Sequence, residues 1–487
     1  LWEVILLSNS VKKNYIYNSL YTILNMLLPL ITAPYLSRVI GTTGVGLYAY
    51  SFSIAQYCVL FAKLGLVNYG TRECAKIRTN KKKLSCIFIN LFTMQCIATI
   101  IVTVIYLFYV ELFSGTYKSI ALIFTIWVVG SFLDIDWFWF GLEEFKKVTI
   151  RNVVVKLLTV ICIFLFVKEK NDVPIYSFIM VMGYVIGYIA IWIGIKRKIY
   201  FSKIQLSEVR KHLVPCIVML IPVLALNIYR SMNKVMLGSM VGMAETGIFD
   251  NGEKFIYCLS GLITSLGTVM LPKMSYLVEK NDVQQIHKYI SLSIKFIVIM
   301  TSAMAFGLMA ISNSLVYVMF GIAFQKSAIV LFLSAPTLIF MGWSNVIRTQ
   351  YIIPHKKDDI YIKSTLFSAI INMLINIMLI NRFLSVGAVI GTLIAEFFVP
   401  FYQYLRLRKE INYRKHLVAV IPYVLIGIGM VLILKFVEQL MGISIITLIV
   451  QTVLGGIIFV TCSVIYIYKC DKELLHFIMS TLKIRKG

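Results

Sequence analysis

The chain is dominated by apolar runs that are long enough to cross a lipid bilayer. A membrane-spanning helix needs about 20 consecutive, mostly apolar residues. The windows that meet this condition lie at residues 15–40, 44–67, 84–110, 119–141, 150–167, 175–195, 213–237, 246–271, 289–312, 327–351, 361–380, 385–404, 417–437 and 444–468. Only 14% of the residues are charged, against roughly 25% in a soluble domain. The sequence therefore predicts an all-α integral membrane protein with fourteen transmembrane helices, and it excludes a soluble globular domain.

The formal net charge is +25, from 47 Lys and Arg against 22 Asp and Glu. In a soluble protein such an excess would suggest nucleic-acid binding. In a multi-pass membrane protein, however, Lys and Arg gather in the cytoplasmic loops. The connections 68–83 and 196–211 carry six Lys or Arg each, and both fall on one side of the predicted membrane. We therefore predict cytoplasmic termini and no nucleic-acid partner.

An internal repeat is visible in three pairs of segments. Residues 40–48 (IGTTGVGLY) resemble residues 241–249 (VGMAETGIF). The GYVIG run that starts at Gly183 resembles the GAVIG run that starts at Gly387, and paired lysines occur at 146–147 and 356–357. Because each copy has six helices, an even number, both copies begin on the same side of the membrane. This predicts a parallel repeat, with the two copies related by an axis along the membrane normal.

The repeat predicts an N-lobe at 11–200, a C-lobe at 201–405, and two appended helices with a cytoplasmic tail at 406–487. Two such bundles would enclose a central cavity and rock around it. The first helix of each copy contains two prolines, which interrupt helical hydrogen bonds and bend helices. We predict these four prolines as hinges: Pro29, Pro34, Pro215 and Pro222.

Charged side chains inside the predicted spans require an explanation. Each one at a helix centre raises the free energy of membrane insertion by roughly 2.5–3.5 kcal/mol. Lys156, Lys295 and Arg348 lie near the predicted cytoplasmic ends, where long side chains reach water. Asp134 and Asp136 also lie near an inner end, next to two tryptophans, Trp137 and Trp139, that would suit an interfacial belt. These positions do not require a binding role.

The charges on the seventh and eighth spans are not explained in this way. Asn227, Arg230 and Lys234 are spaced by three and four residues, so they share one helix face. Polar residues on the first, second and eighth spans would face the same cavity. The predicted substrate-binding residues are Arg230, Lys234, Asn227, Lys254, Lys63, Gln56, Asn25 and Arg38. Arg suits bidentate contact with phosphate, and Lys acts as a point charge.

Asp250 and Glu253 are predicted either to orient these cations or to bind a coupling proton or sodium ion. The alternative is an internal salt-bridge network that only holds the two copies together. No metal cluster, phosphate-binding loop or catalytic triad occurs at membrane depth, so we expect neither an enzyme nor a resident cofactor. None of the nine cysteines has CxxC spacing, and no disulfide framework is expected.

Several local motifs together resemble the polysaccharide flippase (Wzx-type) branch of the MATE/MOP exporter superfamily. They are residues 29–41 (PLITAPYLSRVIG), 44–48 (GVGLY), 136–143 (DWFWFGLE), 151–152 (RN) and 348–354 (RTQYIIP). The resemblance extends over nearly the whole chain.

The resemblance implies a function. The protein would carry an undecaprenyl-diphosphate-linked oligosaccharide from the cytoplasmic to the outer leaflet of a bacterial plasma membrane, for capsule, O-antigen or related polymers. A polysaccharide polymerase would be a possible partner. Two relatives remain as alternatives, an ion-coupled multidrug antiporter and a lipid II-type flippase. Residues 15–40 and 213–237 contain no Asp or Glu, which argues against the antiporter, whose first or seventh helix commonly carries such an acid.

Overall fold

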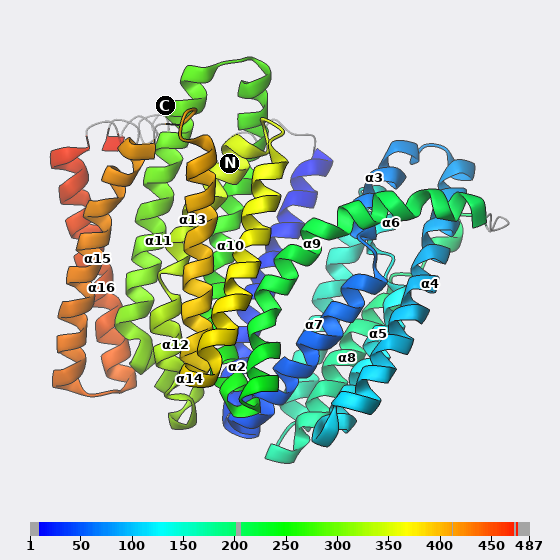
Figure 1. Ribbon diagram of the computed structural model, residues 1–487, viewed down its shortest axis with the longest axis horizontal. Coiled ribbons are helices and arrows are strands. Elements are labelled where there is room, and N and C mark those ends of the chain that lie inside the picture. Colours follow the sequence, from blue (N-terminus) through cyan, green and yellow to red (C-terminus); the bar gives the residue numbers. More distant parts are fainter. Residues whose placement is uncertain (1–8, 201–205, 412, 472–473, 476–487) are drawn as a thin grey trace. The chain divides into compact units, whose positions relative to one another are not determined.

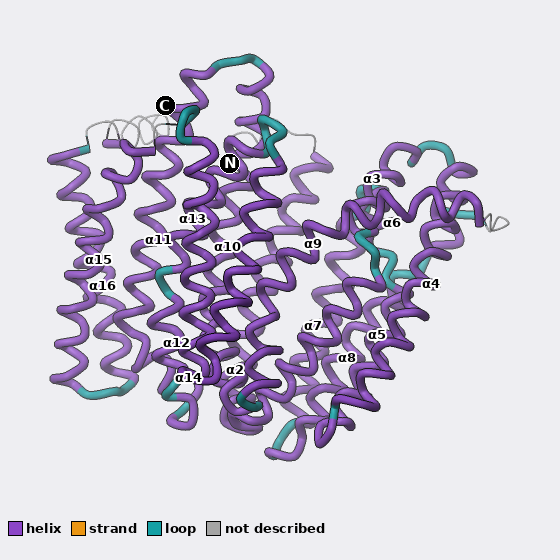
Figure 2. Tube along the Cα trace, in the orientation of Figure 1, coloured by secondary structure: helices purple, strands orange, loops and turns teal. Residues whose placement is uncertain are grey.

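The computed structural model describes residues 9–200, 206–411, 413–471 and 474–475. Within these ranges the ordered elements are all helices, and no strand occurs (Figure 2). The chain divides into two compact units, residues 1–247 and 248–487, which are described one at a time. The side chains of residues 9–27, 116, 206, 222, 225–226, 228–230 and 413–419 lie outside the described part.

The first unit is a bundle of long helices joined by short turns (Figure 1). Its α-helices are α2 (Asn9–Ala62), α3 (Leu66–Ile77), α4 (Lys81–Phe113), α5 (Lys118–Gly130), α6 (Asp136–Gly141), α7 (Phe145–Phe166), α8 (Val173–Ala190) and α9 (Leu206–Met240). Short 3-10 turns connect several of them: η1 (Gly115–Tyr117), η2 (Ser131–Leu133), η3 (Lys170–Asp172) and η4 (Ile195–Arg197). Helix α10 (Met243–Glu279) begins in this unit and continues in the second.

The second unit is also helical. Its further elements are α11 (Val283–Phe320), η5 (Ile322–Phe324), α12 (Ser327–Ser334), α13 (Thr337–Ile347), the π-helix η6 (Arg348–Ile352), α14 (Asp358–Leu407), α15 (Tyr413–Met441) and α16 (Ile445–Cys470). Helices α15 and α16 lie side by side, joined by a short connection, and both pack on α11 (Figure 1).

Each predicted apolar range is helical over most of its length. The described residues contain 11 helical segments that are long and apolar enough to span a membrane. Two of these segments are 50 residues long, and each contains a break in the helical backbone, at Gly41 in α2 and at Leu384 in α14. Both breaks fall between two predicted spans. The protein is therefore a multi-pass membrane protein, and the count of fourteen spans stays a prediction.

One connection differs from its prediction. Residues 68–83 were expected to form a loop, but Leu66–Ile77 form helix α3. This helix buries Leu66, Tyr69, Gly70 and Cys74 and exposes its basic side chains, Arg72 and Lys76. A short apolar face against the bundle, with a basic face toward water, explains why a charged connection folds as a helix.

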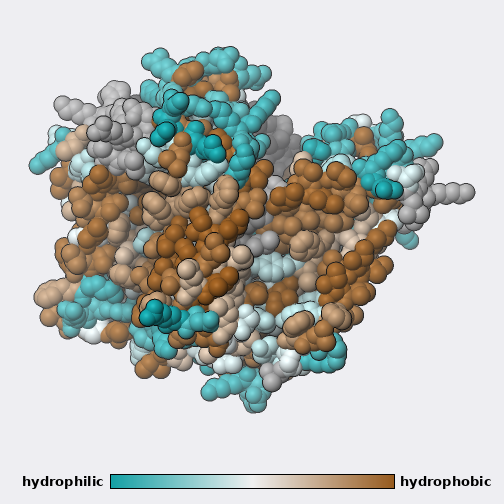
Figure 3. Space-filling view, viewed as in Figure 1, coloured by the Kyte–Doolittle hydropathy of each residue, from teal (hydrophilic) through white to brown (hydrophobic). Residues whose placement is uncertain are grey.

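The surface of the bundles is apolar along the helices and polar at their ends. In Figure 3, brown atoms cover the middle of the helices and teal atoms gather near the helix ends. Helix α4 shows the pattern clearly, since Ile100, Val104 and Phe108 are exposed while Leu91 and Tyr106 are buried. Exposed apolar stripes of this length are stable only against lipid.

Lys295 does not reach water, contrary to the sequence prediction. It lies on α11, is 7% exposed, and forms an ion pair with Asp471 at 2.9 Å. Asp471 follows directly after α16, so the pair ties the end of this helix to α11. Toward the other end of α11, Asn313 donates a hydrogen bond to Glu438 of α15 at 2.7 Å. Polar contacts thus join α11 to its neighbours at both ends.

Candidate functional site

Two ion pairs lie close together inside the first unit. Lys63, which directly follows α2, pairs with Asp134. Arg151 of α7 pairs with Asp136, the first residue of α6, with Nη2 at 2.9 and 2.7 Å from the two carboxylate oxygens. The side chain of Asp134 is 7% exposed and that of Arg151 is 8% exposed. Ion pairs this deeply buried keep most of their mutual attraction, because water does not screen them.

Hydrogen bonds join the two pairs into one network. The backbone N–H of Asp136 donates to Oδ1 of Asp134 at 3.1 Å. Lys63 Nζ donates to the hydroxyl of Tyr188 at 3.4 Å, and Trp127 Nε1 donates to the same oxygen at 3.2 Å. Arg151 Nη1 donates to the carbonyl of Gly187 at 2.9 Å. Groups from α2, α5, α6, α7 and α8 therefore meet at one place.

A polar cavity of about 380 Å³ opens next to this network. Its walls come mainly from α7 and α8, with the charged groups at one side. The lining residues are Lys63, Asp134, Asp136, Arg151, Asn152, Val155, Lys156, Thr159, Met180, Gly183, Tyr184, Gly187 and Tyr188. Three of them are cationic and two are acidic, so the lining has an excess of positive charge. We call this feature the unit 1 pocket.

The helix break before Asp136 is stabilised by a side chain of α4 that is distant in the sequence. The backbone of Asp134 is extended, with ψ of 101°, so the carbonyls at the end of η2 lack helical partners. The buried amide of Gln95 on α4 fills this gap. Its Nε2 donates to the carbonyls of Ser131 and Asp134, both at 2.9 Å, and its Oε1 accepts from Trp137 Nε1 at 3.1 Å.

The tryptophans beside this break are not an interfacial belt, so that prediction is wrong. Trp137 is 2% exposed and Trp139 is 1% exposed, and both belong to the core between α3, α4 and α6. Trp137 packs against Phe88 of α4, and Trp139 Nε1 donates to the carbonyl of Ile191. The aspartates beside them consequently face the bundle interior rather than the membrane surface.

Sequence reasoning missed the partners of Asp134 and Asp136, although a signal was present. Helices α6 and α7 form a hairpin whose turn includes Glu143, with a φ of 60°. Asp136 and Arg151 lie at nearly equal distances along the chain from that turn. Residues at matched distances from the turn of a helical hairpin lie at the same depth, and opposite charges there are candidates for pairing.

The predicted binding residues of α2 and α9 are partly brought together. Gln56 Oε1 accepts a hydrogen bond from Ser231 Oγ at 3.1 Å, which joins the predicted second and seventh spans. Asn227 instead donates to the carbonyl of Val223 in its own helix at 2.8 Å. Lys234 is half-buried, and Arg38 is exposed. The side chains of Arg230 and Asn25 lie outside the described residues.

The predicted ion-coupling acids lie on α10 in the second unit. Asp250 pairs with Lys254 at 3.0 Å, one helical turn away. Glu253 is 4% exposed and accepts a hydrogen bond from the hydroxyl of Tyr257 at 3.1 Å. Lys254, which was predicted to bind substrate, and Asp250, which was predicted to bind a coupling ion, therefore form an ion pair in this structure.

The prolines that were predicted as hinges lie within continuous helix where they are described. Helix α2 continues through Pro29 and Pro34, and its only non-helical residue is Gly41. Pro215 is half-buried in α9, while the side chain of Pro222 lies outside the described part. Their role as hinges stays a prediction.

The unit 1 pocket provides paired charges, hydroxyls and an amide, but no group arranged for covalent chemistry. In the described part of the chain, no group of three or more His, Cys, Asp or Glu is placed to hold a metal ion. The nine cysteines are free thiols. Such a lining is suited to binding a polar or ionic group at membrane depth.

Comparisons with known proteins show similarity to a family of polysaccharide biosynthesis proteins and to transporters. The family described as polysaccharide biosynthesis protein matches residues 11–278. A protein of Escherichia coli K12 with the name "Putative O-antigen transporter" is 26% identical over 395 residues, which covers 80% of this chain and 94% of the relative.

Solved structures show the same fold at low sequence identity. Lipid II flippase MurJ in an inward closed conformation matches with a TM-score of 0.73 at 16% identity, over 93% of this chain and 99% of that one. An inward-facing multidrug resistance MATE family transporter of the MOP superfamily matches with a TM-score of 0.57 at 11% identity, over 80% and 99% of the two chains.

Proposed function

The chain belongs to the polysaccharide biosynthesis protein family, and from this premise we infer that it is a flippase for lipid-linked oligosaccharides. The observation that carries this conclusion is the family match, together with a transporter relative that aligns over nearly its whole length. The MOP-superfamily fold is consistent with it. We propose that the lipid carrier is undecaprenyl diphosphate, that the membrane is a bacterial plasma membrane, and that both termini are cytoplasmic.

The physical task explains why such a protein carries buried charge. A sugar chain and a diphosphate cannot cross hydrocarbon unaided, because their polar groups would lose all hydrogen-bond partners there. A transporter must supply replacement partners at membrane depth while the lipid tail stays in the bilayer. The hydroxyls, the amide and the excess of cations in the unit 1 pocket are groups of this kind.

We propose that the chain crosses the membrane fourteen times, as two parallel six-helix repeats and two appended helices. The 50-residue segments with breaks at Gly41 and Leu384 support two crossings each. Helix α9, with 35 residues, supports one more beyond the 11 segments. On this layout the lobes would be residues 11–200 and 201–405, and alternating access would come from their rocking.

The proposed substrate path is lined by cations of the predicted set, with Arg230 and Lys234 at its centre. Asn227, Gln56, Asn25, Arg38, Lys63 and Lys254 complete the set. In this structure Lys63 and Lys254 are each paired with an aspartate. We propose that a diphosphate competes for these cations during transport, so the acids hold the cations in position until the substrate arrives.

Asp250 and Glu253 are proposed as the groups that bind a coupling proton or sodium ion. Both acids lie on α10, where Asp250 pairs with Lys254 and Glu253 accepts a hydrogen bond from Tyr257. Binding of a proton or sodium ion to either acid would therefore change the net charge around Lys254. No covalent step is proposed. A polysaccharide polymerase would act on the product at the outer leaflet.

The test is to deplete the protein in its host and to measure which leaflet holds the lipid-linked oligosaccharide. Accumulation on the cytoplasmic leaflet, together with loss of surface polymer, is the expected result, and it would also identify the glycan. Re-expression of the unaltered chain should reverse both effects. Normal lipid-linked oligosaccharide with increased sensitivity to cationic drugs would favour a multidrug antiporter, and accumulation of lipid II would favour a peptidoglycan flippase.

A further inference from the structure

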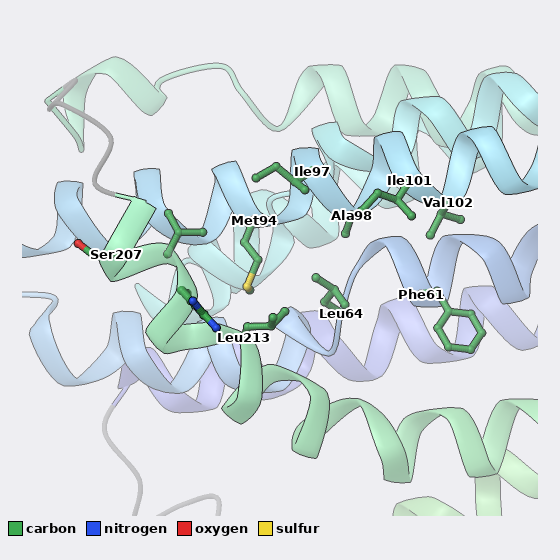
Figure 4. A pocket seen from close by; sticks show the side chains of 11 residues that line it. Phe61, Leu64, Met94, Ile97, Ala98, Ile101, Val102, Ser207 and Leu213 are labelled. Carbon is green, nitrogen blue, oxygen red and sulfur yellow. The ribbon is translucent and has the colours of Figure 1, made fainter.

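A second, apolar cavity of the first unit lies along the sides of three helices. It has a volume of about 730 Å³ and lies between the end of α2, the middle of α4 and the start of α9 (Figure 4). Phe61 and Leu64 form one wall, and residues from Met94 to Val102 form another. We call this cavity the α4–α9 groove. Its α4 wall runs about 12 Å along the helix axis, at 1.5 Å per residue.

The groove is open to the surroundings of the bundle rather than to its interior. Phe61, Ile97, Ile101 and Leu213 line it, and all four are exposed. In a membrane protein, exposed apolar side chains at this depth meet hydrocarbon. An extended apolar chain is therefore the kind of molecule that fills the groove without leaving a polar group unpaired.

One end of the groove is polar. Ser207 and Arg210 lie on the first two turns of α9 and are both exposed. In Figure 4, Ser207 lies at the opposite end of the groove from Phe61 and Val102. The start of α9 forms the last part of the basic connection 196–211, and the backbone N–H of Tyr200 in the same connection donates a hydrogen bond to the hydroxyl of Ser85 near the start of α4. The polar end of the groove therefore lies on one of the two connections that carry six Lys or Arg.

Arg210 is the charged residue among those that line the α4–α9 groove. Its neighbour Glu208 pairs with Lys211 at 2.5 Å, and within the described residues no ion pair involves Arg210. Such a guanidinium, in the same groove as the hydroxyl of Ser207, suits a phosphate group, which it can bind through two parallel hydrogen bonds. One guanidinium matches the single negative charge of a phosphodiester, whereas a diphosphate carries more charge than this end of the groove neutralises.

We propose that the α4–α9 groove binds an anionic glycerophospholipid of the cytoplasmic leaflet. One acyl chain lies along α4, and the phosphate lies at Arg210 and Ser207. This assignment goes beyond the proposed transport of lipid-linked oligosaccharide and does not depend on it.

The surrounding structure holds the groove open in a defined shape. Gly65 has a φ of +73°, and a β-carbon there would lie 2.7 Å from the backbone nitrogen of Leu220 in α9. The hydroxyl of Tyr69 in α3 is 2.8 Å from Nδ1 of His212 in α9. The start of α9 is therefore fastened to α3 at one side of the groove. A lipid between α4 and α9 would add contacts at the other side, so bound lipid is expected to raise thermal stability.

The experiment uses the purified full chain in detergent. Phosphatidylglycerol, phosphatidylcholine and undecaprenyl diphosphate are titrated separately, and bound lipid is counted by native mass spectrometry. Arg210→Gln removes the charge from an exposed position, and Lys211→Gln removes the next cation of the same helix, which does not line the groove. A phosphatidylglycerol with a photoreactive acyl chain reports where the chain lies.

The expected result is a preference of the unaltered protein for phosphatidylglycerol over phosphatidylcholine. Arg210→Gln should weaken phosphatidylglycerol binding by roughly tenfold, as for the loss of one charged hydrogen-bonded contact, while Lys211→Gln should not. The photoreactive chain should label the peptide that contains Ile97 and Ile101. Equal binding of both phospholipids, an unchanged affinity in Arg210→Gln, labelling elsewhere, or displacement of phosphatidylglycerol by undecaprenyl diphosphate would each overturn the proposal.

Discussion

Gly46 and Gly247 pack against each other and against the backbone that precedes each of them. A β-carbon on Gly46 would lie 1.7 Å from the carbonyl oxygen of Met243, and one on Gly247 would lie 2.1 Å from the carbonyl oxygen of Thr42. The two contacts are equivalent under the same 201-residue shift that relates the two similar segments of the sequence. All four residues lie in the first unit. This reciprocal contact supports the proposed repeat, because matched positions meet as they would across a twofold axis.

Replacing either glycine by alanine should disrupt this contact. Gly46→Ala and Gly247→Ala each place a methyl group where a backbone carbonyl now lies, and overpacking of this kind costs about 1–3 kcal/mol. We expect a lower melting temperature in detergent and reduced export of surface polysaccharide. Gly429→Ala and Gly456→Ala are matched controls in α15 and α16, since a β-carbon at either position meets nothing within 4 Å. Equal melting temperatures for all four variants would contradict the close packing.

The Lys63–Asp134 pair should show strong coupling between its two members. Removing one partner leaves a buried charge without compensation, which costs about 3–5 kcal/mol. We therefore expect Lys63→Met and Asp134→Leu to destabilise the protein much more individually than the double variant does. Thermal unfolding of the four proteins gives the coupling free energy.

Transport by the same double variant separates two roles for the pair. If the pair only stabilises the bundle, a stable double variant will export polysaccharide normally. We expect export to be lost, because Lys63 lines the unit 1 pocket. Normal export by a stable double variant would remove Lys63 from the proposed binding set.

Arg151 should not be replaceable by lysine. Arg151 bonds both oxygens of Asp136 and the carbonyl of Gly187, and a lysine ammonium cannot reproduce this planar arrangement. Arg151→Lys is expected to lower the melting temperature by several degrees and to reduce export. Lys146→Arg, a change at an exposed position of the same helix, provides the control, and similar losses in both variants would argue against a need for the guanidinium at Arg151.

The cations of α9 should be needed for transport but not for membrane insertion. Arg230→Ala and Lys234→Ala are each expected to abolish export while the amount of protein in the membrane stays unchanged. Ser239→Ala, an exposed position of the same helix, is the control. Two single variants that export normally would exclude the proposed cationic path.

Glu410, which lies just after α14, should make its contact with Tyr351 of η6 and with Lys357 sensitive to acid. Burial raises the pKa of its carboxyl, but hydrogen bonds from Lys357 and Tyr351 outweigh this effect and hold the pKa below its ordinary value. The contact therefore contributes stability above the ordinary glutamate pKa of about 4.3, and this stability is lost as the pH falls through the lower folded-state pKa. Comparing the melting temperatures of the unaltered protein and Glu410→Gln tests this. The difference should be constant from about pH 6 to 8 and should shrink below about pH 4; a difference that grew on acidification would contradict it.

Much of the architecture followed from the sequence. The apolar runs predicted where helices lie, because a helix that meets lipid must be apolar over a length set by the bilayer. The break at Gly41 fell between two predicted spans, at a residue type that tolerates a positive φ. The family resemblance, which rested on short motifs, was confirmed by the match over residues 11–278.

The tertiary structure decided which charged groups meet. Lys63 and Asp134 are 71 residues apart, and Lys295 and Asp471 are 176 apart, so no local spacing relates them. Trp137 and Trp139 looked like an interfacial belt because the hydropathy of a residue does not reveal whether its neighbour is lipid or protein. Only the packing of α3, α4 and α6 places both rings in a core. The sequence by itself determined which segments are long and apolar enough to cross a membrane, since that depends on the composition of each segment alone. The pairing of helix faces depends on helices that are distant in sequence.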